Sequence, residues 1–244
     1  MKQTRLYLGA LLFIIGLTGP VRAANIAIDT LYNFEGFTSG TTLTTADAPL
    51  SIIGSTVGLT VESINGSQAM QLVTTTGGDE IRMDFAGGTE PTSGTFEFDY
   101  SLQSTLGTDL RLVLRSSAGD LLRMILTDAG DVTYLSGNGS GGSSAATETG
   151  AFSNLSTVFN SFSVNVDTAS DVWGFSVGST NISGLSFQND RDASDITAIV
   201  MRAQGGSYTG AIDNVQFVTV PEPSTYALVL VASGLLWILR RKLA

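Results

Sequence analysis

From residue 50 onward, apolar and polar residues alternate along short segments that are separated by Gly, Asp, Ser and Asn. In one such segment the apolar positions are Phe96, Phe98, Tyr100 and Leu102. Alternation over four to eight residues is typical of strands that bury one face. Three such segments lie within 109–135, and Gly and Asp in the two linkers between them favour tight turns. We therefore predict a three-stranded antiparallel meander over residues 109–135.

The same alternation predicts further strands on both sides of this meander, whereas no segment between residues 24 and 220 shows a convincing helical period. The additional strands are expected at 57–62, 68–75, 81–85, 96–102, 158–166, 171–177, 196–203 and 210–218. Ten or more short strands in one stretch of chain indicate two packed sheets. We predict that residues 24–219 form one all-β domain, an antiparallel β-sandwich of the jelly-roll type.

One interruption of the strand pattern spans residues 136–150, with the sequence SGNGSGGSSAATETG. A segment this small and polar cannot bury enough apolar surface to order itself, which predicts a flexible loop. The alternative is a boundary between two domains. We favour the loop because too few strands remain on either side for two separate sandwiches.

The N-terminus has a basic head, an apolar run over residues 6–17, and the small residues Val21 and Ala23 at the −3 and −1 positions of a cleavage site. This is the layout of a secretory signal peptide, which predicts a signal over residues 1–23 and cleavage after Ala23. The Sec translocon and signal peptidase are then expected partners. An uncleaved membrane anchor is the alternative, but the apolar run is short for a membrane span.

The C-terminal segment 220–244 also has three parts. They are the triplet Pro221, Glu222 and Pro223, the apolar run 226–239, and the basic residues Arg240, Arg241 and Lys242. A helix of this length rises about 21 Å, less than the hydrocarbon core of about 30 Å, so it can span a membrane only with thinning or help from its flanks. The basic residues should stay in the cytoplasm, which places the predicted domain on the other side of the membrane.

These three parts, in this order, resemble the PEP-CTERM sorting signal of Gram-negative bacteria that secrete exopolysaccharide. The resemblance implies recognition and processing near the triplet by an exosortase. It also implies a stay in the inner membrane before the protein reaches the cell surface or extracellular matrix. A plain C-terminal membrane anchor is the alternative. The signal carries no information about the activity of the domain that it sorts.

Composition narrows the possible chemistry of the domain. The chain has no cysteine and no histidine, which excludes disulfides, Cys- or His-based triads and the common zinc sites. Between residues 24 and 220 there are six arginines, no lysine and 21 acidic residues, a net charge near −15. Such a surface repels nucleic acid, which we do not expect as a partner, and it suits cations.

The segments 33–37 and 210–217 resemble the first and last strands of carbohydrate-binding-module and concanavalin A-like jelly rolls. In those folds the two terminal strands lie side by side and carboxylates often hold a structural Ca²⁺. The resemblance implies Glu35 and Asp213 as candidate calcium ligands, and calcium coordination needs oxygen ligands only. Alternatively, Asp213 and Asn214 only shape the end of a strand.

Two carboxylates, Glu97 and Asp99, share one face of a predicted strand. The pattern resembles the Glu-x-Asp-x-x-Glu strand of laminarinase-like retaining glycosidases, but position 102 is Leu where that family has its second catalytic Glu. Without this carboxyl the retaining mechanism lacks its proton donor. The simpler interpretation is the solvent side of a half-buried strand.

Exposed aromatic rings could stack on sugars. Trp173 and Tyr208 are the two candidates for carbohydrate contact. Trp173 has apolar neighbours on both sides, which favours a core position. Tyr208 follows two glycines and a serine, which predicts an exposed turn.

The sequence thus favours an exported, exosortase-processed and non-catalytic protein of the cell surface or extracellular matrix, structural or adhesive in the exopolysaccharide layer. The alternative is a calcium-dependent, lectin-like module that binds carbohydrate. A glycan-active enzyme is the third hypothesis, and it needs a second carboxylate near Glu97 and Asp99.

Overall fold

The computed structural model describes residues 31, 33–43, 50–53, 58–74, 80–85, 91–103, 109–204 and 208–219. These residues form fourteen strands and one short 3₁₀-helix, η1 (Gln188–Asp190). None of the helical segments in these ranges is long and apolar enough to cross a membrane.

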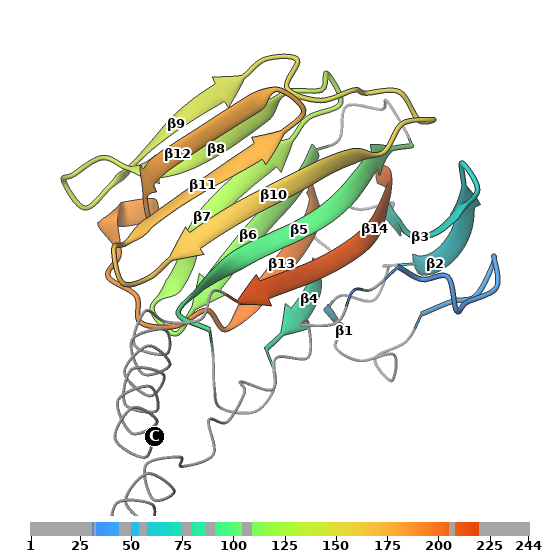
Figure 1. Cartoon of the computed structure of the whole chain (residues 1–244), viewed down its shortest axis with the longest axis horizontal. Helices are drawn as coiled ribbons and strands as arrows, with labels where there is room; N and C mark the ends of the chain where they lie inside the picture. The colour runs from blue at the N-terminus through green and yellow to red at the C-terminus, as the bar shows by residue number, and fades with distance from the viewer. Residues whose placement is uncertain are drawn as a thin grey trace, which may run out of the picture.

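The strands form two seven-stranded sheets in which every neighbouring pair is antiparallel. Sheet I contains, in spatial order, β1 (Leu50–Ile53), β4 (Glu80–Asp84), β13 (Ala198–Gln204), β6 (Asp109–Ser116), β7 (Gly119–Leu126), β8 (Val132–Gly137) and β9 (Ser143–Glu148). Sheet II contains β12 (Thr180–Ser186), β11 (Val172–Val177), β10 (Asn160–Asp167), β5 (Ser93–Leu102), β14 (Tyr208–Thr219), β3 (Ser67–Thr74) and β2 (Gly58–Ile64). Figure 1 shows the long strands of sheet II in front of those of sheet I. The predicted antiparallel β-sandwich is confirmed.

The core lies between the two sheets and follows from the alternation in the sequence. Phe96, Phe98 and Tyr100 of β5 are buried, as are the leucines at alternate positions of β6 and β7. The rings of Phe98 and Phe162, from neighbouring strands, stack with their centroids 5.0 Å apart. Each fully buried apolar side chain of this size contributes about 1.5–3 kcal/mol relative to exposure. The opposite side of β5 carries polar residues, whereas that of β6 and β7 carries arginines together with Val113 and Ile125.

The predicted meander over 109–135 is confirmed as β6, β7 and β8, paired in sequence order. Gly119 and Gly130 adopt positive φ angles in the two linkers where turns were expected. All the other strands predicted from alternation are also present. The structure adds β1, β9 and β12, which the pattern did not indicate.

The prediction of a loop over residues 136–150 is wrong, because most of this segment forms the β8–β9 hairpin. The turn is held by polar groups rather than by apolar burial. The Asp190 carboxylate accepts hydrogen bonds from the backbone N–H groups of Gly139 (3.0 Å) and Gly141 (2.7 Å). The side-chain oxygen of Asn138 accepts two more within the turn. These bonds order a segment that contributes little to the core.

The predicted signal peptide with its cleavage site at Ala23, and the whole sorting segment 220–244, lie outside the described residues. The triplet Pro221–Pro223, the helix 226–239 and the basic tail 240–242 therefore stay predictions.

Candidate functional site

The outward side of sheet II is lined with hydroxyl, amide and carboxylate side chains. Side chains at alternate positions of β5 and β10 point away from the core, and β14 adds two amides. The principal members are Ser93, Thr95, Glu97, Asp99, Ser161, Ser163, Asn165, Asp167, Asn214 and Gln216. Two hollows lie on this side of the sheet, with volumes of about 840 and 710 Å³. Both fall in the size range of small-ligand sites, about 300–1,000 Å³.

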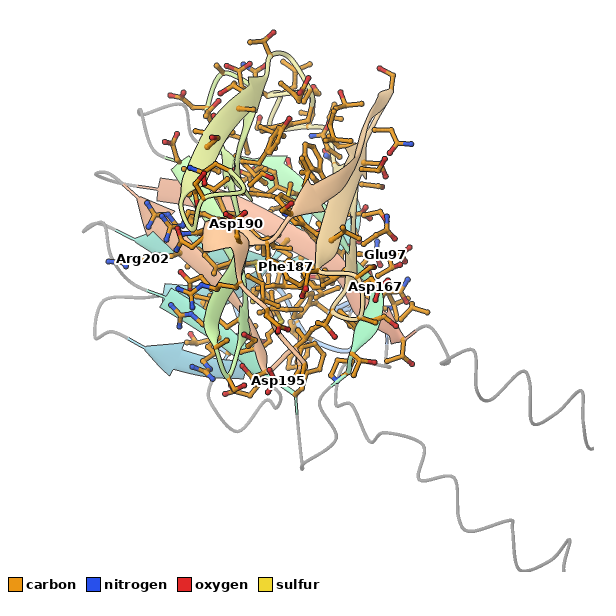
Figure 2. The ribbon with its side chains drawn as sticks, turned by 90° about the vertical axis from the view of Figure 1, so that its left-hand side faces the viewer. Glu97, Asp167, Phe187, Asp190, Asp195 and Arg202 are labelled. Atoms are coloured by element: carbon orange, nitrogen blue, oxygen red, sulfur yellow. The ribbon has the colours of Figure 1, made fainter. Side chains whose placement is uncertain are left out.

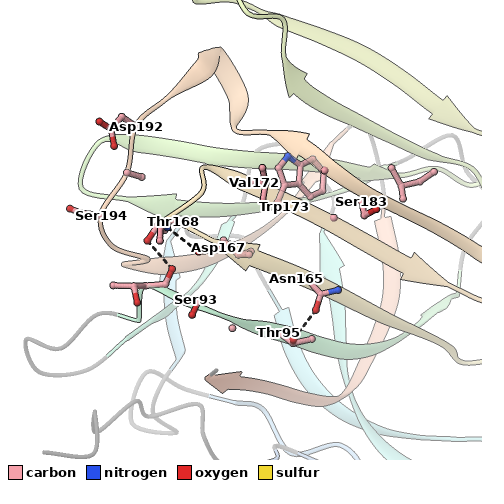
Figure 3. Close-up of a pocket in the computed structure, with 18 of the residues that line it drawn as sticks. Ser93, Thr95, Asn165, Asp167, Thr168, Val172, Trp173, Ser183, Asp192 and Ser194 are labelled. Atoms are coloured by element: carbon pink, nitrogen blue, oxygen red, sulfur yellow. Dashed lines mark hydrogen bonds between the residues drawn. The ribbon is translucent and has the colours of Figure 1, made fainter. Parts of the chain in front are cut away.

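The larger hollow lies over the ends of β5, β10, β11 and β12 (Figure 3). Thr95 donates a hydrogen bond from Oγ1 to Asn165 Oδ1 at 2.8 Å, which fixes the amide of Asn165. Asp167 Oδ1 accepts from the backbone N–H of Ala169 at 2.9 Å. The hollow therefore presents oriented donors and acceptors on a rigid sheet, as recognition of a hydroxyl-rich ligand requires.

The smaller hollow contains the carboxylates of Glu97 and Asp99. Asp99 accepts hydrogen bonds from Ser161 Oγ at 2.6 Å and from Asn214 Nδ2 at 2.7 Å. Gln216 donates from Nε2 to Glu97. A β-bulge in β14 between Asp213 and Gln216 breaks the pairing with β5 and brings these amides to the carboxylates.

The placement of Glu97 and Asp99 on the solvent side of a strand is confirmed, since Phe98 between them is buried in the core. Leu102 is also buried, and it points into the sandwich. A residue at this position therefore does not share the face of Glu97. The glycosidase pattern lacks its second Glu both in the sequence and on this face of the strand.

A second polar cluster joins Glu35 to Asp213. Ser67 Oγ lies 2.9 Å from Glu35 Oε1 and 2.6 Å from Asp213 Oδ2, and the backbone N–H of Gln68 donates to Glu35 at 3.0 Å. The structure thus brings the two predicted calcium ligands together. The expected first strand is wrong, however, because residues 33–37 form a turn, and the neighbours of β14 are β5 and β3.

Asp213 is 2% exposed, and burial raises the pKa of its carboxyl. Hydrogen bonds from Ser67 and from the backbone N–H of Asn214 lower this pKa, and the charges of Asp99 and Glu35 raise it. Within the described residues no group of three or more Asp, Glu, His or Cys side chains could hold a metal ion. A calcium ion between Glu35 and Asp213 would need backbone, hydroxyl or water oxygens for its remaining ligands. The calcium site stays a prediction.

Of the two aromatic residues predicted to contact carbohydrate, the structure excludes Trp173 and leaves Tyr208 untested. Trp173 is 2% exposed, its ring meets Tyr134 and Phe175, and its Nε1 donates to the backbone oxygen of Ser186 at 3.2 Å. A ring enclosed in this way cannot stack on a sugar, so that prediction is wrong and the core interpretation is confirmed. Tyr208 is the first residue of β14 and pairs through its backbone with Thr74, rather than lying in a turn. Its side chain lies outside the described residues, so its contact with sugar stays a prediction.

Sequence reasoning missed Ser67, Asn165 and Gln216, which complete the polar surface. Each is a common residue with no motif of its own, and each reaches its partner from a different strand. The alternation shows only that Asn165 faces away from the core. Its contact with Thr95 depends on the pairing of β10 with β5.

No protein-family model and no curated protein matches this sequence. The fold is similar to that of several solved structures. A sialidase has a TM-score of 0.60 at 14% identity over 80% of this chain, which spans 19% of the sialidase chain. The apo Crh5 transglycosylase has a TM-score of 0.51 at 12% identity, covering 81% of this chain and 88% of the other. Alginate lyase AlyC3 has a TM-score of 0.50 at 7% identity, covering 78% and 89%. At these identities the likeness shows a concanavalin A-like jelly-roll fold and nothing more.

Proposed function

We propose that this protein is an exported, non-catalytic component of an extracellular polysaccharide layer that contacts glycan through the outward side of sheet II. The observation that carries the proposal is the pair of hollows lined by oriented hydroxyl, amide and carboxylate groups. Glycans are rich in hydroxyls, and such groups match them with donors and acceptors. Export and sorting by an exosortase rest on the two terminal segments of the sequence.

The carboxylates of the smaller hollow support a binding role over a hydrolytic one. Glycosidases generally use two carboxyl groups that flank the scissile bond. Glu97 and Asp99 instead lie two residues apart on one strand, and Gln216, Ser161 and Asn214 hydrogen-bond to them. Both carboxylates are thus already engaged by side chains of neighbouring strands in the same sheet.

The proposal is tested by binding of the full chain, purified in a nonionic detergent, to a panel of neutral polysaccharides and, separately, to the producer's own exopolymer. Asn165→Ala and Gln216→Ala should each weaken binding about five- to tenfold, because each removes a hydrogen-bonding group, which contributes roughly 1 kcal/mol. Thr147→Ala, which removes an exposed hydroxyl on sheet I, is the matched control and should bind as the native chain does. If Asn165→Ala and Gln216→Ala both bind as tightly as the native chain, the proposed site is refuted.

A second candidate, calcium-dependent binding of carbohydrate, is favoured by the convergence of Glu35 and Asp213 on Ser67. If calcium binds there, it should raise the Tm of the full chain, and EDTA should reverse the rise, because a ligand that binds only the folded state stabilises it. Asp213→Asn should abolish the shift, whereas Glu62→Gln, an isosteric change on β2, should preserve it. If neither calcium nor EDTA changes the Tm, calcium-dependent binding is refuted.

A further inference from the structure

The arginines of the domain are gathered on one surface. Of the six arginines between residues 24 and 220, five lie on the outward side of sheet I, opposite the apolar positions that face the core. We name this set the arginine patch: Arg82, Arg111, Arg115, Arg123 and Arg202. Figure 2 shows Arg202 on one flank of the molecule and Glu97 and Asp167 on the other. A strongly acidic domain thus concentrates its positive charge on the side away from the two hollows.

Strand pairing places the central arginines next to one another. Arg202 of β13 is the direct cross-strand partner of Arg111 on β6. Arg123 of β7 pairs with Val113, which lies two residues from Arg111 on the same side of β6. Neighbouring strands are about 4.8 Å apart, so three guanidinium groups from three adjacent strands share one small area.

This arrangement is unfavourable for the protein alone. Like charges directly opposite one another destabilise a sheet, and burial together with the charges of Arg123 and Arg202 lowers the pKa of Arg111. The Nε atoms of Arg111, Arg123 and Arg202 are buried, and no group in the described ranges accepts a hydrogen bond from them. Buried donors without acceptors are rare in folded proteins, and each calls for an explanation.

Carboxylates neutralise the margins of the patch. Arg82 forms an ion pair with Asp84, its neighbour on β4. Asp120 pairs with Arg115 at 3.0 Å and with Arg123 at 3.3 Å. The side chains of Arg82, Arg115 and Arg123 remain partly exposed in these pairs, at 31%, 30% and 25%.

The centre of the patch is less well neutralised. For Arg111 and Arg202 no ion pair within the described part of the chain is found. Asp109 precedes Arg111 on the same side of β6 and interacts with its charge, while burial and the charge of Asp128 raise the pKa of Asp109. Glu80 is the backbone partner of Arg202 on β4. The patch therefore carries more guanidinium than carboxylate.

We propose that the arginine patch binds an acidic polysaccharide through the carboxylates of its uronate residues. The proposal rests on the extracellular polysaccharide setting proposed above and names a second polymer, bound on the opposite sheet. Guanidinium matches a carboxylate with two parallel hydrogen bonds, and several arginines on adjacent strands can engage successive carboxylates of one chain.

The overall charge favours a uronate chain over nucleic acid. Duplex DNA carries one negative charge per about 1.7 Å, and a domain with a net charge near −15 repels such a polymer. A polyuronate has one carboxylate per sugar, which is much sparser, and its hydroxyls add neutral contacts. The same net charge therefore repels a polyuronate less strongly than duplex DNA, and close contacts with the arginines can outweigh that weaker repulsion.

The test measures binding of the full chain, in nonionic detergent, to polygalacturonate and to alginate. Arg111→Gln with Arg202→Gln should weaken binding at least about tenfold, because charge-assisted hydrogen bonds are lost from the centre of the patch. The same pair changed to Lys keeps the charge but not the two-pronged geometry and should fall between the native chain and the Gln pair. Arg191→Gln removes one positive charge outside the patch, and it should change binding less than twofold.

Three outcomes would overturn the proposal. Binding to fully methyl-esterified polygalacturonate as tight as to the free acid would show that carboxylates are not recognised. Equal binding to duplex DNA or polyglutamate would show a general polyanion surface rather than a uronate site. Native affinity in the Gln pair would place the site elsewhere. The Tm of each variant is measured as a control for folding. It should be unchanged or higher, because the substitutions remove like charges, and weaker binding then cannot be attributed to unfolding.

The experiments can refute either proposal without refuting the other. Loss of uronate binding alone, with neutral glycans still bound in the hollows, would refute the arginine patch and leave the proposed function standing. Binding of uronate in the absence of any neutral glycan binding would refute the hollows on sheet II and support the patch.

Discussion

The pKa values of two aspartates, Asp190 and Asp213, are shifted in opposite directions, so the two carboxylates have opposite effects on the stability of the fold. Asp190 is exposed, and hydrogen bonds from the backbone N–H groups of Gly139 and Gly141 lower the pKa of its carboxyl. Asp213 is buried beside Asp99 and Glu35, and burial, the largest effect, raises its pKa. A lowered pKa means that the folded state favours the charged form, and a raised pKa means the reverse. Asp190 therefore stabilises the fold at neutral pH, whereas charged Asp213 opposes it.

The pH dependence of Asp213→Asn tests this difference. Because the pKa of Asp213 is higher in the folded than in the unfolded state, its stabilising effect is greatest at low pH and declines as pH rises through the folded-state pKa. In calcium-free buffer the Tm of the variant should therefore rise relative to that of the native chain as the pH increases from about 3 to about 7. The gain should be a few degrees, since 1 kcal/mol shifts Tm by about 2–4 °C in domains of 150–250 residues.

Circular dichroism melting curves of both chains across this range provide the measurement. The two chains differ only at residue 213, so the difference between their Tm values reports on Asp213. A difference that stays constant with pH would contradict the raised pKa.

Among the elements, apolar alternation reveals the strands that bury a full face and misses those at the edges. β5, β6 and β7 place large apolar residues at alternate positions, so their sequences alone predict them. β9 and β12 are the outermost strands of their sheets, and few of their side chains are buried. Their order comes from backbone pairing and from polar anchors such as Asp190, and an apolar pattern does not report on either.

The β8–β9 hairpin offers a test of such an anchor. A Cβ atom on Gly137 would lie 2.1 Å from Asp190 Oδ1 and 2.6 Å from the backbone oxygen of Phe187. Gly137→Ala should therefore displace Asp190 from the turn and destabilise the domain by about 1–3 kcal/mol, the usual cost of overpacking.

Hydrogen exchange locates the effect. In the Gly137→Ala variant the amides of Gly139 and Gly141 should lose protection while those of β5 and β6 keep theirs. Gly36→Ala is the matched control, because a Cβ there has no atom within 4 Å. Unchanged protection in the turn would show that Asp190 does not hold it.

For the candidate sites too, the sequence of one strand predicts which side a residue faces, but contacts between residues on different strands depend on the order of the strands in the sheet. The sequence places Glu97 and Asp99 on the solvent side of one strand, and the structure confirms it. It equally places Arg111 and Arg123 at polar positions of their strands. It does not show that Arg202, which lies far along the chain, is the partner of Arg111, because that contact depends on β13 lying beside β6. Contacts of this kind follow from topology rather than from periodicity.

For the whole molecule, the important feature is that its two polar surfaces lie on opposite sides of one apolar core. The hollows lie on the outward side of sheet II and the arginine patch lies on the outward side of sheet I. A ligand on one surface does not obstruct the other. Under the two proposals a single domain would hold a neutral and an acidic polymer at once, and would therefore act as a cross-link.

The position of β14 determines how the domain responds to mechanical force. β14 lies between β5 and β3, and its pairing with β5 continues to Thr219 opposite Gly94. Tension applied to the chain beyond Thr219 acts along the strand, whereas the hydrogen bonds of an antiparallel pair run perpendicular to it. These bonds are therefore strained together in shear, and they do not open one after another. The sandwich is thus pulled through one of its interior strands, where many bonds must break before it yields.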